Sequence, residues 1–439
     1  MRATAIEIVR RLQQAGFAAY WAGGCVRDML RGVSPEDYDV ATSARPEAIE
    51  RLFSHTIPVG KQFGVMLVIE GGHQFQVAAF RSESGYQDGR HPTSVQFTDA
   101  QTDASRRDFT VNGMFFDPVT EKLFDWVGGK ADLQTRTLRT IGRPADRFAE
   151  DHLRLLRVIR FAAQLDFQIA PETWAAVRAD AATIASVSAE RVREELIRLL
   201  RAPHAARGLS LLRESGLLAQ VLPEIAATVD CQQSPDFHPE GTVFEHLIKM
   251  LEQLPKEAAL SLPWAMLLHD VAKPQTAETD PATGSIHFYG HERVGAEMSE
   301  QILERLRFPR KQIDEIVFAV RHHMQFKDVR EMRKATLRRL LLRPTYPLEL
   351  ELHRLDCLGS HGRLDNYHYL QHARTELEQT PAAEPPLVRG RDLLELGLAP
   401  GPAMGQLLAE IRERQLEDEL TTREQALAWV TAKLGEPRK

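Results

Sequence analysis

The sequence predicts an α+β protein in which a small domain with a mixed sheet is followed by an all-helical remainder. Short apolar or alternating runs, bounded by Gly, Pro and Ser, are concentrated before residue 100 and are typical of strands. From Leu138 onward, apolar residues recur three or four positions apart, which is the spacing of one helix face. This change of pattern indicates a domain boundary.

The patterns divide the chain of 439 residues into four parts. The first part contains the strand-like runs, the second is rich in arginine, the third carries several histidines, and the fourth follows the proline-containing linker TPAAEPP. We expect a head, a helical neck, a helical body and a linker with a helical tail, at residues 1–136, 137–215, 216–379 and 380–439 respectively.

The head is expected to begin with an amphipathic helix, because Ile8, Val9 and Leu12 fall on one face. The strands that follow are expected at AAYWAG, DYDVAT, VMLVIE, QFQVAAF and SVQFTD. The neck is expected to contain no strand and three clear helices, at EDHLRLLRVIRFAAQL, PETWAAVRADAATIA and AERVREELIRLLRA.

Composition restricts the class of protein. The hydrophobic fraction is 43% and the charged fraction 26%, as in soluble globular chains, and no apolar run is long enough to span a membrane. Charged residues interrupt the first helix, which excludes a signal-peptide core, and the 3 cysteines lie far apart, as in proteins of reducing compartments. We therefore expect a cytoplasmic protein with no membrane partner, whose oligomeric state the sequence does not determine.

Positive charge is concentrated in two stretches, although the net charge is −6. The stretches Arg136–Arg213 and Arg305–Arg343 are rich in arginine and lysine. Such stretches either bind nucleic acid or are solvated helix faces, and their composition leaves both alternatives open.

Two aspartates in the run DYDVAT are candidate metal ligands. Side chains alternate between the two faces of an extended strand, so Asp37 and Asp39 would share one face and Tyr38 would lie on the other. Mg²⁺ prefers hard oxygen ligands and keeps positions open for phosphate oxygens. The pair could therefore hold the metal of a phosphoryl or nucleotidyl transfer, although an Asp-x-Asp pair alone is more often a surface or turn feature.

A phosphate-binding turn is expected just upstream. Gly23 and Gly24 separate the strand-like AYWA from the helical CVRDML, and their backbone amides can approach a phosphate at a helix start. Arg27 would add a fixed positive charge. A Gly-Gly pair by itself is commonly no more than a turn.

A candidate base-reading pair follows in EDHLRLLR. Asp151 and Arg154 are three residues apart and would share one helix face, with Arg157 nearly one turn further on. A carboxylate can accept from an exocyclic amine while a guanidinium donates to the adjacent ring nitrogen, which would admit CTP and ATP and reject UTP and GTP. In isolation, an Asp and an Arg at this spacing more often form a surface ion pair.

A second constellation lies in the expected body. Its members are histidines and aspartates that suit a divalent metal for phosphoester hydrolysis. They are His246, His269, Asp270 and Asp356. His291, with His322 or His323, could complete a second metal position. A lone His-Asp pair is usually structural.

Taken together, the string GG-x-V-R-D followed by D-x-D resembles the head signature of the class II tRNA nucleotidyltransferase and poly(A) polymerase family. The resemblance implies a polymerase β-like head in which Asp37 and Asp39 bind the catalytic metals. RRDFTVNGM resembles the family's second motif, and EDHLRLLR its E-D-x-x-R motif. AERVREEL resembles the next motif, where helix support is expected more than direct contact.

The resemblance also assigns residues beyond the aspartate pair. It implies that the nucleotide is bound by Gly23, Gly24, Arg27, Arg107, Asp108, Asn112, Asp151, Arg154 and Arg157. The set in the body resembles the HD superfamily, which implies an HD-type helical body and a second divalent metal. Three positions depart from these patterns. Gly113 replaces the usual Ala, Gln76 stands where a third carboxylate is frequent, and Ala272 replaces the Gly of HD-x-G-K.

The function implied by the resemblance is Mg²⁺-dependent addition of CCA to the 3′ end of tRNA, from CTP and ATP, with the tRNA acceptor end as partner. The loop-like GYQDGRHPTSVQF resembles the segment that adjusts the site between additions, and it favours terminal A addition. Two alternatives stay open. One is a poly(A) polymerase or an enzyme adding only A, and the other is an HD-domain phosphohydrolase whose head only binds RNA.

Overall fold

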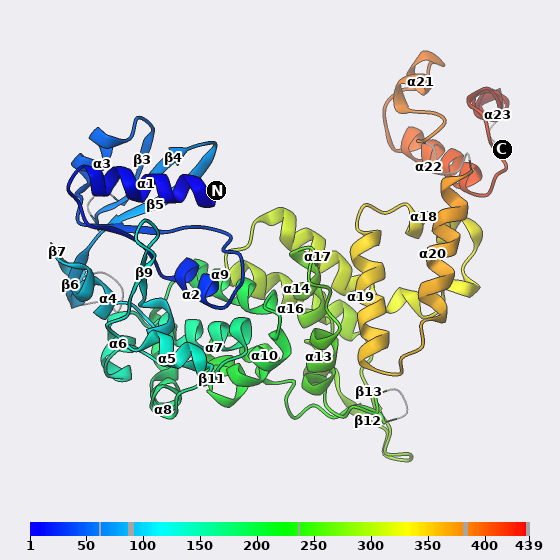
Figure 1. Ribbon diagram of the computed structural model, residues 1–439. Helices are drawn as coiled ribbons and strands as arrows, with labels where there is room; N and C mark the ends of the chain where they lie inside the picture. The colour runs from blue at the N-terminus through cyan, green and yellow to red at the C-terminus, as the bar shows by residue number, and fades with distance from the viewer. Residues whose placement is uncertain (61–62, 87–91, 236–237, 381–384, 436–439) are drawn as a thin grey trace. The chain divides into compact units, whose positions relative to one another are not determined.

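The computed structural model describes residues 1–60, 63–86, 92–235, 238–380 and 385–435 (Figure 1). Residues 87–91 of the expected adjusting loop therefore lie outside the described residues. The chain divides into two compact units, Met1–Ala226 and Ala227–Lys439. No helix in the described ranges is both long and apolar enough to cross a membrane.

Unit 1 begins with the predicted mixed sheet. Seven strands follow the order β3-β4-β5-β2-β1-β8-β9, in which only the β2–β5 pair is parallel. They span Ala19–Ala22 (β1), Val40–Thr42 (β2), Thr56–Gly60 (β3), Val65–Glu70 (β4), His73–Ala79 (β5), Phe115–Asp117 (β8) and Lys122–Phe124 (β9). A separate hairpin joins β6 (Arg81–Tyr86) to β7 (Pro92–Phe97).

Helix α1 (Arg2–Gln14) lies against this sheet, as the apolar periodicity predicts (Figure 1). Ile8, Val9 and Leu12 are fully buried and share one core with residues of the sheet such as Trp21 and Phe75. Four short helical segments fill the connections of the head: α2 (Gly24–Leu30), α3 (Pro46–Leu52), α4 (Ala100–Ser105) and α5 (Gly129–Gln134), together with the 3-10 turn η2 (Thr110–Asn112).

The remainder of unit 1 is helical with one exception. Its helices are α6 (Pro144–Glu150), α7 (Arg154–Leu165), α8 (Pro171–Asp180), α9 (Ala189–Leu200), α10 (Ala205–Glu214), α11 (Leu217–Val221) and α12 (Pro223–Ala226), with η3 (Ala181–Ser186) after α8. The expectation of a strand-free neck is wrong, because β10 (Thr137–Leu138) pairs in parallel with β11 (Gln168–Ile169). Strands of two residues are too short to leave an alternating pattern in a sequence.

Unit 2 is a helical assembly. Its first part contains α13 (Val243–Glu252), α14 (Ser261–Leu268), α15 (Lys273–Thr276), a small hairpin of β12 (Glu278–Thr279) and β13 (Ile286–His287), α16 (His291–Arg305), α17 (Arg310–His322), η4 (His323–Phe326) and η5 (Val329–Glu331). Its second part contains α18 (Lys334–Leu341), α19 (Tyr346–Gly359), α20 (Asp365–Glu378), α21 (Gly390–Glu395), α22 (Pro402–Leu416) and α23 (Arg423–Gly435). Every side chain of α14 is buried, so this helix is packed inside the first part of the unit.

Part of the second basic stretch is used inside unit 2. Lys334 and Arg338 of α18 both form ion pairs with Asp418, at 2.6 Å, and Arg339 pairs with Glu413 of α22. Arg338 also donates to the backbone carbonyl of Leu416 at 2.8 Å. These cations therefore attach the tail to the body, although the side chains of Lys334 and Arg339 stay half exposed, as on a solvated helix face.

Gly113 provides a test of packing in the head. A Cβ at this position would lie 2.7 Å from Val127 Cγ2 and 2.9 Å from Ile141 Cδ1, although the backbone conformation suits any residue. We expect Gly113→Ala to lower the free energy of unfolding by about 1–3 kcal/mol through overpacking. Urea unfolding of the variant measures this loss.

The added variant Val127→Ala should restore part of that loss, because it removes the nearer contact. Gly405→Ala is the control, since an added Cβ in α22 would meet nothing within 4 Å. An equal effect of Ala at positions 113 and 405 would contradict the packing explanation.

Candidate active site

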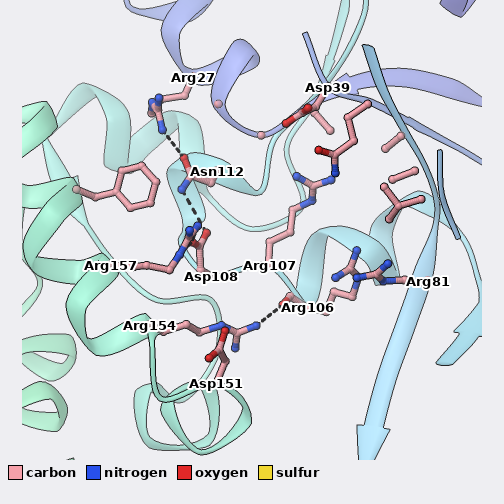
Figure 2. Close-up of a pocket in the computed structure, with 18 of the residues that line it drawn as sticks. Arg27, Asp39, Arg81, Arg106, Arg107, Asp108, Asn112, Asp151, Arg154 and Arg157 are labelled. Carbon is pink, nitrogen blue, oxygen red and sulfur yellow. Dashed lines mark hydrogen bonds and ion pairs between the residues drawn. The ribbon is translucent and has the colours of Figure 1, made fainter. Parts of the chain in front are cut away.

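A cavity of about 410 Å³ in unit 1 collects the predicted residues from the head and the neck (Figure 2). Ten of the eleven residues predicted for catalysis or nucleotide binding line it: Gly23, Gly24, Arg27, Asp39, Arg107, Asp108, Asn112, Asp151, Arg154 and Arg157. Asp37 is the exception, and it is exposed to solvent. The assigned roles stay predictions, but the residues do share one cavity.

The two aspartates precede the strand on which they were expected. Strand β2 begins at Val40, and Asp39 is held at its entry because the Ala22 amide donates to the Asp39 carbonyl at 3.0 Å. Tyr38 is buried, with its ring 4.6 Å from that of Trp21. The chain therefore turns Tyr38 into the core and leaves both carboxylates outside it, as alternation predicted, without a sheet ladder through Asp37 or Asp39.

The charge state of Asp39 reflects this placement. Burial, together with the nearby charge of Asp37, raises the pKa of Asp39 to about 6, and Arg107 opposes the shift. A carboxylate whose ionisation is opposed by a neighbouring carboxylate is a suitable ligand for a divalent cation, whose charge would favour the ionised form. The position of the expected third carboxylate is occupied by Gln76, which lines the cavity from β5.

The Gly-Gly turn brings backbone close to an arginine. Gly23 has a φ of +78°, which only glycine adopts readily, and a Cβ there would lie 3.0 Å from Arg107 Nη1. Gly24 is the first residue of α2. Arg27, on the same helix, is only 5% exposed and donates from Nη1 to Asn112 Oδ1 at 2.8 Å.

Asp108 is bound within the protein. Its Oδ1 accepts from Asn112 Nδ2 at 3.2 Å and from the Phe109 amide at 2.8 Å, and its Oδ2 accepts from Arg157 Nε at 3.0 Å. Although burial opposes it, Arg157 lowers the pKa of Asp108 to about 2. A ribose hydroxyl would have to share these oxygens, so Asp108 holds Arg157 in place whatever else it binds.

Asp151 and Arg154 do not share one helix face, so that prediction is wrong. Asp151 follows the end of α6 with an extended backbone, and Arg154 is the first residue of α7, so no continuous helix joins them. Asp151 Oδ1 accepts from the Leu153 amide at 3.1 Å, within the short connection between α6 and α7. Both side chains nevertheless line the cavity, close together in Figure 2.

Three arginines that line the cavity were not among the predicted site residues: Arg81, Arg106 and Arg191. Arg191 of α9 donates to Asp151 Oδ2 at 2.7 Å, although its motif was expected to give helix support only. The arginine-rich composition of the neck was a signal for Arg191, whereas Arg81 carried none. Among the described residues, seven arginines and three aspartates line the cavity, so it favours a polyanion.

The candidate HD residues of unit 2 also come together, in two groups of three. His246, His269 and Asp356 present ligand atoms within 4.8 Å of one another. Asp270, His291 and His323 form the other group by the same measure. His323 is therefore the partner of His291. His322 Nδ1 donates to the Phe318 carbonyl oxygen at 2.8 Å, and His322 belongs to neither group.

The histidine orientations suit metal binding. The Nδ1 atoms of His269, His291 and His323 lie 2.8, 2.8 and 2.7 Å from backbone carbonyl oxygens, so each Nε2 faces the cluster. His246 is oriented differently, because its Nδ1 lies 2.8 Å from Glu240 Oε1 and its Nε2 lies 3.1 Å from Asp356 Oδ1. Such outer partners fix which nitrogen can bind a metal. Glu240 was not predicted from the sequence.

Comparison with known proteins assigns the family. The family models that match are the Poly A polymerase head domain at residues 19–139, the probable RNA and SrmB-binding site of polymerase A at residues 166–228, and the HD domain at residues 242–358. An A-adding tRNA nucleotidyltransferase from Deinococcus radiodurans is 36% identical over 93% of this chain and 94% of its own length. The chain belongs to the class II tRNA nucleotidyltransferase and poly(A) polymerase family.

Further relatives agree with this assignment. A CCA-adding enzyme from Bacillus pumilus is 40% identical over 49% of this chain and 54% of its own length, so the chain matches about half of that relative. The crystal structure of the Bacillus stearothermophilus CCA-adding enzyme in complex with CTP is 28% identical, with a TM-score of 0.75, and the match covers 98% of this chain and 96% of that one. This chain is therefore a nucleotidyltransferase with an HD domain.

The raised pKa of Asp39 predicts a dependence of stability on pH. The folded protein favours the neutral carboxyl, so this contribution to stability is present at low pH and is lost as pH rises through about 6. Asp39→Asn should therefore stabilise the metal-free protein more at pH 7.5 than at pH 4.5, by about 2 kcal/mol. Urea unfolding at the two pH values measures the difference.

Added Mg²⁺ is the control, because it should stabilise the wild type at pH 7.5 more than it stabilises Asp39→Asn. An identical effect of the substitution at both pH values would show that Asp39 has no raised pKa.

Proposed function

We propose that this nucleotidyltransferase adds CCA to the 3′ end of tRNA, taking CMP and AMP from CTP and ATP without a nucleic-acid template. The observation that carries the proposal is the single cavity, which places Asp39, an arginine-rich wall and the Asp151–Arg154 pair around one space. We also expect the protein to act in the cytoplasm, because its proposed substrate is tRNA.

The reaction is a displacement at the α-phosphorus of the nucleotide. The 3′-hydroxyl oxygen of the RNA forms a bond to that phosphorus, the bond to the β-phosphate breaks, and pyrophosphate leaves. Asp37 and Asp39 offer hard oxygen ligands, so they would hold Mg²⁺. When bound, the metal would supply charge neutralisation at the phosphates and a lower pKa for the attacking hydroxyl.

The arginines perform the binding of the triphosphate. Arg107 reaches across the cavity toward Asp39 (Figure 2). Its Nη1 lies beside the turn at Gly23, where phosphate oxygens could also meet backbone amides. Arg157 is held by Asp108 and so keeps its position before a nucleotide arrives. When the side chains of a cavity are already ordered, binding costs less conformational entropy.

Base selection is assigned to Asp151 and Arg154. Asp151 accepts two hydrogen bonds from the protein, one at each oxygen, and each oxygen retains a further lone pair for an exocyclic amine. Arg154 is fixed by Glu150 at 2.6 Å and by the backbone carbonyl of Arg106 at 3.2 Å. Cytosine and adenine both present an amine next to a ring acceptor, whereas uracil and guanine present a carbonyl in place of the amine.

The decisive experiment supplies tRNA that ends at the discriminator base, with Mg²⁺ and labelled CTP and ATP together or separately. We expect CMP to be added before AMP and addition to stop after three nucleotides. Asp39→Asn should lower the rate at least 100-fold, because it removes a charged metal ligand.

Glu36→Gln, which changes an exposed neighbour, is the matched control. Addition of A alone, and only to tRNA already ending in CC, would replace the proposal with the activity named for the Deinococcus relative. Incorporation of neither nucleotide, whether the supplied tRNA ends at the discriminator base or already ends in CC, would refute both.

A second activity is proposed for the two histidine–aspartate groups of unit 2, as an accessory metal-dependent phosphohydrolase. The side chains of His246, His269, Asp270, His291 and His323 are at most 7% exposed, whereas Asp356 is 29% exposed. Solvent and a phosphoester can therefore approach the cluster at Asp356. Imidazole nitrogens combined with carboxylates suit a borderline divalent metal.

This second activity has its own test. Purified protein should bind up to two divalent ions per unit-2 cluster, measured by metal analysis after dialysis against Mn²⁺, and should hydrolyse bis-p-nitrophenyl phosphate. Asp270→Asn should reduce both the metal content and the hydrolysis, because Asp270 belongs to one group and contacts His269 of the other at 3.1 Å.

His322→Ala is the control, since His322 lies outside both groups. Full metal content in Asp270→Asn would contradict the assignment, whatever the result of tRNA addition.

A further inference from the structure

A buried carboxylate lies behind the arginine wall of the cavity. Asp103 of α4 is 1% exposed and does not line the cavity itself. Its Oδ1 accepts from the Arg81 amide at 3.2 Å and from Arg106 at 2.9 Å, and its Oδ2 accepts from Arg107 Nε at 3.3 Å and Nη2 at 3.2 Å. One carboxylate therefore contacts three residues whose atoms do line the cavity.

These ion pairs differ from the usual pairs at this spacing. An acid and an arginine three or four residues apart on a helix are normally exposed and contribute little. Here the Asp103 side chain is 2% exposed, and those of Arg106 and Arg107 are 22% and 21% exposed. Because the acid is desolvated, its hydrogen bonds fix the direction of both guanidinium groups.

The fixed direction is toward the expected phosphates. Arg107 uses Nε and Nη2 on Asp103, which leaves Nη1 beside Gly23 at the Gly-Gly turn. Its guanidinium also lies 4.8 Å from the ring of Phe115, which limits rotation. The planar arginine fork thus has one edge on Asp103 and another toward the cavity.

The charge balance of the cavity gives Asp103 a further role. Of the three aspartates that line the cavity, Asp108 pairs with Arg157 and Asp151 pairs with Arg191. Arg106 and Arg107 pair with Asp103 instead. Without that carboxylate, mutual repulsion would favour conformations in which these arginines point away from one another and from the cavity.

We propose that Asp103 is a positioning residue that holds Arg106 and Arg107 toward the triphosphate, and thereby strengthens the binding of every nucleotide irrespective of its base. This inference rests on the proposed nucleotidyl transfer. It adds a residue outside the recognised motifs and separates binding of the phosphates from selection of the base.

The test is Asp103→Asn, which keeps the shape and removes the charge. KM for CTP and for ATP should both rise by about tenfold and by the same factor, because the charge-assisted bonds that are lost hold the arginines toward the phosphates, which both nucleotides share. Inhibition by inorganic pyrophosphate, which has no base, should weaken by that factor too. Discrimination against UTP and GTP should not change.

Asp99→Ala is the matched control. Asp99 caps the start of α4 by accepting from the Thr102 amide at 2.8 Å, so its loss weakens the same helix without contacting the arginines. If Asp103 only stabilised the helix, Asp103→Asn and Asp99→Ala would lower the free energy of unfolding equally, and both would leave the KM values unchanged. Asp103→Glu should recover part of the lost affinity, since it restores the charge.

A double-variant comparison keeps the inference testable if Asp103→Asn folds poorly. Because Asp103 acts partly through Arg107, adding Asp103→Glu to Arg107→Ala should raise KM by a smaller factor than Asp103→Glu does in the wild type. If the wild type incorporates nucleotides but pyrophosphate inhibits every Asp103 variant as strongly as it inhibits the wild type, the inference is overturned. Failure of the wild type to incorporate CMP or AMP would instead refute the proposed function.

Discussion

The ion pair between Asp108 and Arg157 joins the sheet domain to the helical neck. Asp108 follows α4 in the head, whereas Arg157 belongs to α7. The pair extends on one side through Asn112 to Arg27 and on the other to Glu195, at 3.7 Å. Buried charges are expensive to desolvate, and removal of one partner leaves the other uncompensated, so this network strongly favours a single arrangement of head and neck.

That arrangement determines what the cavity can contain. Asp39 comes from the head and Asp151 from the segment between α6 and α7, and neither could serve one nucleotide without the fixed junction. Phe161 reinforces it, because its ring lies within 5.4 Å of the guanidinium groups of both Arg27 and Arg157. The residues proposed to bind the metal and to read the base are therefore positioned relative to each other before any substrate binds.

The parts of this structure that were predictable are those with a periodic or local signal. The first helix followed from the spacing of Ile8, Val9 and Leu12, and the mixed sheet from the apolar runs of the head. Motif residues such as Gly23 and Asp108 could be found because each belongs to a short run of the sequence that carries a recognisable pattern. The change from sheet to helix was also visible, since the two periods differ.

The remaining features depend on contacts between distant residues. The contact from Arg191 to Asp151 spans 40 positions, and no local pattern records it. The break between α6 and α7 was missed because the Asp151 side chain bonds to backbone in competition with the helix. His322 and His323 are neighbours with the same composition around them, and only the end of α17 determines which one turns inward.

The two candidate sites carry opposite electrostatic demands. Among the described residues, the cavity of unit 1 has an excess of guanidinium groups, which favours an anion, whereas the histidine–aspartate groups of unit 2 bring together ligand atoms that suit a cation. Nucleoside triphosphates chelate divalent metals, so the two ligands are linked by mass action in solution. A rise in nucleotide at constant total metal would fill the first site and withdraw metal from the second. The ratio of nucleotide to metal would then decide which of the two sites in one chain is occupied.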